Sequence, residues 1–167
     1  YETKRAEPME LSVVNPGPVN GPTLLGDLSG ASMGMLKQIL LEKMLMVPKS
    51  AINMSDVRDI TKIDVLAREN ENANGKRFIV ATEKAQKFQE IAQHIKSNGY
   101  DKVSTRLAPN FLLNFIGNFD REARSMKTFI GKTYDGDVYS TMETFNWKLI
   151  SLEKTVLDTI KSIESFA

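Results

Sequence analysis

Hydrophobic and polar residues along much of the chain alternate with helical spacing. Apolar residues recur three and four positions apart in residues 32–47, 82–98 and 109–130, which predicts three helices. Pro48 follows the first of these segments and Gly99 follows the second, and both residue types commonly end helices.

The C-terminal segment carries the most regular pattern and predicts one long helix. Ser140 and Glu143 have the spacing of a capping box, in which each side chain bonds a backbone N–H of the other residue. A three-four repeat of mostly apolar residues follows, which fits the seam of a bundle or coiled coil. Its members are Met142, Phe145, Leu149, Leu152, Val156, Thr159, Ile163 and Phe166.

The segment from 57 to 81 supports two interpretations. Its apolar residues fit helical spacing, while Ile63, Val65 and Ala67 also alternate as in a strand. We expect a short helical turn at 55–62 and then a small β-hairpin near 63–81, since Lys76–Val80 is rich in strand-forming residues. Residues 103–107 are expected to add a third strand.

Residues 1–31 differ from the rest because four of the six prolines fall there, among several glycines. Such a segment cannot form a helix or a central strand. It therefore keeps a fixed shape only where another surface satisfies its backbone groups. That surface is either a neighbouring subunit, as we expect, or the body of its own chain.

Together these patterns predict a mainly α fold with a small β element and four or five helices. The expected organisation is an extended arm (1–31), a helix-rich body (32–136) and a long C-terminal helix (137–167). At 167 residues the chain is long enough for one such domain with a real core.

Composition and charge exclude several classes of protein. No apolar run approaches the ~18 residues of a membrane span, so the chain is expected to be soluble or part of a large assembly such as a virus particle. The chain has no cysteine, which excludes thiolate metal sites and disulfides, and its single histidine, His94, cannot form an imidazole metal site by itself. We therefore predict no metal, no cofactor and no catalytic residue.

The function expected from these patterns is that of a non-catalytic structural subunit, plausibly in a virion or phage particle. Its partners would be subunits of the same assembly, in a homo- or hetero-oligomer, gripped by the arm and the C-terminal helix. The predicted interface residues are methionines of an adaptable helix, the sole tryptophan and the C-terminal seam. They are Met33, Met35, Met44, Trp147, Leu149, Leu152, Val156 and Ile163.

Two alternatives remain open. The segment 76–106 has a local excess of positive charge, which would suit an accessory module that binds nucleic-acid phosphates. Its cations are Lys76, Arg77, Lys84, Lys87, Lys96, Lys102 and Arg106. The other alternative is an enzyme with a carboxylate site among Asp135, Asp137 and Glu143.

Overall fold

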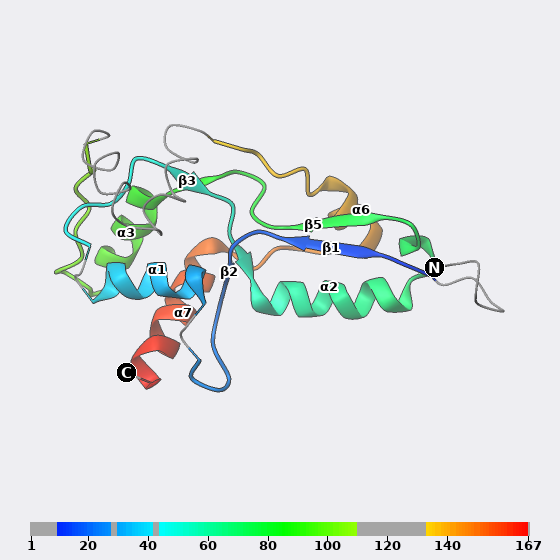
Figure 1. The fold of residues 1–167 in the computed structure, drawn as a ribbon, viewed down its shortest axis with the longest axis horizontal. Coiled ribbons are helices and arrows are strands. Elements are labelled where there is room, and N and C mark those ends of the chain that lie inside the picture. Colours follow the sequence, from blue (N-terminus) through cyan, green and yellow to red (C-terminus); the bar gives the residue numbers. More distant parts are fainter. Residues whose placement is uncertain (1–9, 28–29, 42–43, 110–132, 167) are drawn as a thin grey trace.

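The computed structural model describes residues 10–27, 30–41, 44–109 and 133–166. The elements in chain order are β1 (Val13–Pro16), β2 (Val19–Asn20), α1 (Ala31–Leu40), β3 (Ala51–Ile52), β4 (Ser55–Asp56), α2 (Val57–Glu69), the 3-10 helix η2 (Glu71–Ala73), β5 (Arg77–Val80), β6 (Gln86–Lys87), α3 (Phe88–Ser97), α6 (Tyr139–Phe145) and α7 (Leu152–Phe166) (Figure 1).

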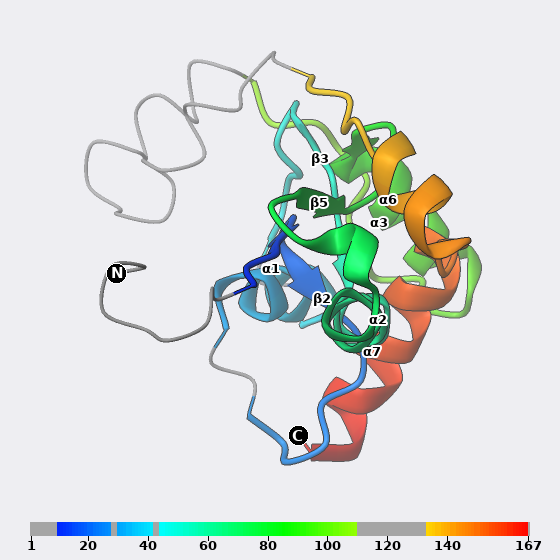
Figure 2. The same cartoon turned by 90° about the vertical axis from the view of Figure 1, so that its right-hand side faces the viewer.

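Two pairs of parallel strands organise one end of the molecule. β1 pairs with β5, with Val13 opposite Arg77, and β2 pairs with β4, with Val19 opposite Ser55. Helix α2 runs beneath the β1–β5 pair, as the view along that helix shows (Figure 2). The expectation of a mainly helical fold with a hairpin at 63–81 was therefore wrong. The partner of β5 lies more than sixty residues away in sequence, where a local pattern gives no signal.

The described part of the leader lies on its own chain rather than on a neighbour. The Val13 amide donates to the Lys76 carbonyl at 3.0 Å, and the Gly17 amide donates to the Ser55 Oγ at 2.7 Å. A side chain at Gly17 would lie 2.1 Å from the Asn53 carbonyl oxygen, so only glycine allows this close approach. Residues 10–27 are thus part of the domain, and the expectation of an arm reaching for another subunit was wrong for them.

Helix α2 occupies most of the segment for which helix and strand competed. Asp56 caps it by accepting a hydrogen bond from the Arg58 amide at 2.9 Å. Ile63 and Ala67 are buried, whereas Val65 is 51% exposed. The helical spacing therefore determined the structure here, and the strand-like alternation had no structural counterpart.

The C-terminal segment forms two helices instead of one. Asn146 adopts a left-handed conformation with φ of 45°, which ends α6, and α7 begins at Leu152. N-cap Val138 makes no side-chain cap bond, so the capping box expected at Ser140 does not form. Between the helices, Asp59 of α2 accepts hydrogen bonds from the Trp147 indole at 2.9 Å and the Ile150 amide at 3.0 Å. These bonds anchor the link to the body and turn the chain away from a continuous helix.

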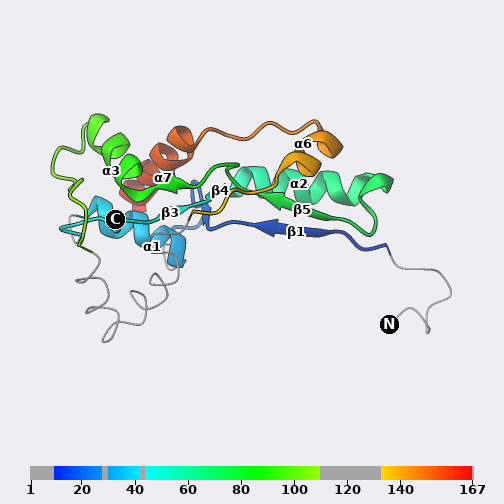
Figure 3. The ribbon, with the colours of Figure 1, turned by 90° about the horizontal axis from the view of Figure 1, so that it is seen from above.

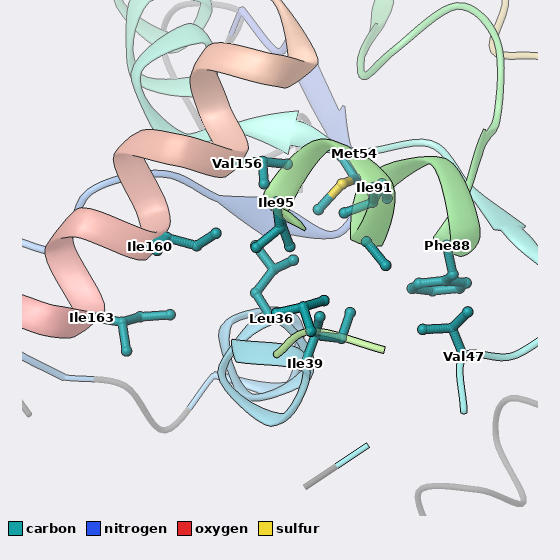
Figure 4. Close-up of a cluster of buried hydrophobic side chains, with 12 residues drawn as sticks. Leu36, Ile39, Val47, Met54, Phe88, Ile91, Ile95, Val156, Ile160 and Ile163 are labelled. Atoms are coloured by element: carbon teal, nitrogen blue, oxygen red, sulfur yellow. The ribbon is translucent and has the colours of Figure 1, made fainter. Parts of the chain in front are cut away.

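The larger core lies between α1, α3 and α7 (Figure 4). Leu36 and Ile39 of α1 meet Ile91 and Ile95 of α3 there, and α7 contributes a row of three residues, Val156, Ile160 and Ile163. A smaller cluster of Ile63, Val80, Val138 and Trp147 joins α2 to the strands. Val156 and Ile163 of the expected seam lie in the larger core, whereas Met142 and Phe166 are exposed.

Other expected elements differ in extent. Helix α1 ends at Leu40, seven residues before the expected end. Helix α3 starts at Phe88 because residues 86–87 pair with β3 as strand β6, and Gly99 follows it with φ of 99°. Residues 103–107 contribute a single parallel bridge between Leu107 and Val47. The helix expected at 109–130 lies almost wholly outside the described residues.

Among the described residues, no helix is both long enough and apolar enough to cross a bilayer.

We predict that Asp59→Ala lowers the free energy of unfolding by about 2–4 kcal/mol, since the buried Trp147 N–H and the partly buried Ile150 N–H would lose their shared acceptor. Urea titration followed by the fluorescence of the sole tryptophan would measure the loss. Asp64→Ala, an exposed position on the same helix, serves as the matched control and should change stability by less than about 0.5 kcal/mol. Equal losses in the two variants would refute the anchoring role of Asp59.

Candidate functional site

An apolar groove opens between helix α2 and the loop that follows β2. Its volume is about 900 Å³, and residues 19–25, Asp27, Met33 and several residues of α2 between 57 and 66 line it. Each wall directly follows the carboxyl end of a parallel strand, β2 for the loop and β4 for α2. Ligand sites of open α/β folds form at this end of the strands.

The loop wall presents large apolar side chains to solvent. Leu24 is 90% exposed and Leu25 is 92% exposed, and Val65 lies across from them on α2. Monomeric proteins rarely leave such a contiguous apolar surface uncovered unless it binds something. Two cations, Arg58 and Lys62, also line the groove.

A buried carboxylate lies behind the groove, where α2 meets α7. The Asp56 side chain is fully buried and accepts from the Arg58 guanidinium at 2.7 Å and from the Thr155 hydroxyl at 2.7 Å. Arg58 also donates to Asp158 of α7 at 2.7 Å, and Lys154 donates to the same carboxylate at 2.8 Å. Arg58 is therefore held by two carboxylates, which leaves Lys62 as the more available cation of the groove.

These contacts shift the ionisation of all three groups in the cluster. Burial pushes the pKa of Asp56 upward, but hydrogen bonds from Arg58 and Thr155 outweigh it and hold the pKa below its ordinary value. The hydrogen bond from Lys154, with that from Arg58, lowers the pKa of Asp158 against a smaller effect of burial. The hydrogen bond to Asp56 raises the pKa of Arg58 further. The cluster is thus charged across the physiological range.

The structure distributes the predicted interface residues over the interior rather than over one surface. Trp147, Val156 and Ile163 are buried within the chain, while Met35, Met44, Leu149 and Leu152 are partly buried against the two cores. Met33 is the one member of the set that lines the groove.

The seven predicted phosphate-binding cations are all exposed, but they lie on different elements and none lines the groove. Lys87 pairs with Glu90 at 2.9 Å. Asp135 and Asp137 are exposed, and Glu143 lines a separate polar hollow of about 620 Å³ with Glu69 and Glu71. No group of three or more potential metal ligands occurs in the described part of the chain.

Sequence reasoning missed the groove, although two signals for it were present. Gly21 and Pro22 directly follow the short strand β2, and Asp56, Arg58 and Asp59 place three charged residues at the start of a helix. A turn rich in glycine and proline after a strand is typical of ligand-binding edges in α/β folds. The interpretation of the leader as an arm obscured that signal.

No family model matches the chain, and no curated protein sequence matches it. Its fold, however, is similar to that of several solved enzymes. Gre2 from Candida albicans, solved in complex with NADPH, has a TM-score of 0.66 and 24% identity, with 98% of this chain and 46% of that chain covered. The yeast methylglyoxal/isovaleraldehyde reductase Gre2, complexed with NADPH, has a TM-score of 0.61 and 20% identity over 94% of this chain and 44% of that chain. PA4631, a nucleoside-diphosphate-sugar epimerase from Pseudomonas aeruginosa, has a TM-score of 0.72 and 13% identity, with 94% of this chain and 49% of that chain covered.

These likenesses overturn the expected structural role. The fold is an α/β fold with parallel strands, of the Rossmann kind found in NAD(P)-binding reductases and epimerases, and not a helical bundle. The neighbours are enzymes, so the expectation of a non-catalytic virion component was wrong. The chain spans less than half the length of each of these three neighbours.

We predict that Asp56→Asn destabilises the protein by about 2 kcal/mol near neutral pH, because the partly exposed Arg58 would lose its buried partner. The folded pKa of Asp56 lies below the unfolded value of 3.8. Its contribution to stability is therefore present above that pH and is lost as the pH falls further. The melting temperature should be measured at a series of pH values from neutral to strongly acidic. It should fall less steeply with acidification in the variant than in the wild type. Asp135→Asn, at an exposed position, should retain the wild-type profile.

Proposed function

We propose that this chain forms part of the active site of an NADPH-dependent carbonyl reductase, with the groove holding the apolar part of an aldehyde or ketone. The main support is the position of the groove at the carboxyl ends of two parallel strands. The likeness to two reductases that were solved with NADPH supports the same reaction class.

The composition of the groove favours an apolar carbonyl compound over a nucleotide sugar. A nucleoside diphosphate needs several cations or backbone N–H groups directed at its phosphates. Of the two cations in the groove, Arg58 is already held by Asp56 and Asp158. The exposed Leu24 and Leu25 instead favour a substrate with an alkyl or aromatic substituent.

The residues of this chain do not by themselves fit the pyrophosphate of NADPH. Rossmann domains hold it with a glycine-rich turn of the form Gly-x-Gly-x-x-Gly, and no two glycines in this chain are separated by a single residue. The pyrophosphate would therefore be held by a further segment or a second chain. The role proposed for the present residues is to bind and orient the substrate and to exclude water from it.

A free strand edge offers a place for that further unit. In the described residues β1 pairs with β5 alone, and no described element covers the outer side of β1 (Figure 3). Parallel sheets are normally larger than two strands and covered on both faces. We propose that the partner of this chain adds parallel strands to the outer edge of β1 and carries the cofactor site.

The first test is reduction by the purified natural protein that contains this chain. We expect NADPH consumption with isovaleraldehyde and related branched aldehydes, followed by the loss of NADPH absorbance. A nucleoside-diphosphate sugar should not be epimerised. Absence of NADPH consumption across the aldehyde series, or epimerisation of the sugar, would contradict the proposal.

The second test fills the groove. Val65→Trp should raise KM for branched aldehydes at least about tenfold, since the indole would occupy the space needed by the substituent, with little change in KM for NADPH. Leu45→Trp is the matched control, because Leu45 is 77% exposed and lies outside the groove lining. Similar kinetics in the two variants would show that the groove is not where the substrate binds.

A further inference from the structure

Helix α7 carries a row of polar side chains that points away from the core. Thr155, Thr159 and Ser162 are buried and follow one another at spacings of four and three residues, so they share one face of the helix. A different row of α7, Val156, Ile160 and Ile163, faces the apolar core (Figure 4). The polar row therefore contributes hydrogen bonds to other segments rather than apolar packing in the core.

The C-terminal part of this row holds the loop wall of the groove. The Gly21 amide donates to the Thr159 hydroxyl at 2.8 Å, and the Thr23 amide donates to the Ser162 hydroxyl at 2.9 Å. Farther along, the Phe166 ring packs so closely on Gly26 that an added Cβ would lie 2.8 Å from it. The loop runs beside the end of α7 in both Figures 1 and 2.

The N-terminal part of α7 holds the opposite wall. Thr155 donates to Asp56 at 2.7 Å, and Asp158 accepts from Arg58 at 2.7 Å, both at the start of α2. One helix therefore contacts both walls of the groove through side chains a few residues apart. Because α7 is also fixed by its buried apolar row, it sets the separation of the two walls.

We propose that Thr159 and Ser162 are positioning residues that fix the loop wall at a set distance from α2 and thereby determine which carbonyl substrates the groove accepts. The selectivity part of this inference rests on the proposed function, whereas the positioning part does not. The loop from Gly21 to Asp27 contains no helix or strand. Hydrogen bonds to α7 side chains therefore hold its backbone in place, as bonds to a neighbouring strand do in a sheet. Loss of either hydroxyl leaves a backbone N–H without its acceptor and allows the wall to move outward.

The test compares two serines of the same helix. Ser162→Ala removes the acceptor of the Thr23 amide, while Ser165→Ala removes an exposed hydroxyl that bonds only the Ser162 carbonyl of its own helix. Thr159→Val, which keeps the side-chain shape, removes the acceptor of the Gly21 amide. Hydrogen exchange of the natural protein should become roughly fivefold faster at Thr23 in Ser162→Ala and at Gly21 in Thr159→Val, and stay unchanged in Ser165→Ala.

Selectivity is measured in the same variants as the ratio of kcat/KM for isovaleraldehyde to that for a bulkier aromatic aldehyde. Ser162→Ala and Thr159→Val should lower this ratio at least about threefold through KM, with kcat for isovaleraldehyde retained, and Ser165→Ala should keep the wild-type ratio. The inference would be overturned if Ser162→Ala and Ser165→Ala had the same exchange rate at the Thr23 amide, or the same ratio of kcat/KM for the two aldehydes.

A second readout separates the two proposals if no aldehyde is reduced. Binding of the apolar dye anilinonaphthalene sulfonate is then compared, with the Val65→Trp variant defining the part that arises from the groove. A change of at least about threefold in groove-dependent dye affinity in Ser162→Ala and Thr159→Val, with none in Ser165→Ala, would support the positioning role while the reductase proposal fails. An unchanged affinity would refute the positioning role as well.

Discussion

The contact between Asp56 and Arg58 fixes the geometry on which the candidate site depends. A fully buried carboxylate is tolerated only when it is paired and hydrogen-bonded, and here Arg58 and Thr155 satisfy it. The same carboxylate caps α2 and bonds to α7. One buried charge thus joins strand β4, helix α2 and helix α7, and the groove lies next to this junction.

A second constraint comes from residues 10–27 of the leader, which form strand β1 and one wall of the groove. Its first part extends the parallel pairing with β5, and its second part leaves β2 and turns around the groove. The prolines and glycines that exclude a helix are the residues that permit this path, because Gly17 approaches the Asn53 carbonyl and Gly21 adopts φ of 126°. A segment without regular structure over much of its length can thereby shape a binding site.

The groove, the open edge of β1 and the absence of a glycine-rich dinucleotide turn fit together in one proposal. The described residues supply an apolar site beside parallel strands, and among them only β5 pairs with β1, so the proposal assigns the cofactor contacts to a further unit. The reductases and the epimerase with a similar fold are each about twice the length of this chain. Their length is consistent with a substrate site in this chain and a cofactor site in a further unit. Selectivity within such a site would then depend on α7, which contacts both walls.

The sequence by itself determined the local features: the apolar faces of α3 and α7, the helix end at Gly99 and the inability of the leader to form a helix. It left helix and strand open for α2, where the expected hairpin was wrong. It did not determine which strands pair, because β1 and β5 are far apart in the chain and parallel pairing leaves no local turn signal. It also did not reveal that Asn146 and the bonds to Asp59 divide the C-terminal repeat into two helices. Only the tertiary structure placed the leader against α2 and α7, since the groove arises from contacts between segments up to 139 residues apart.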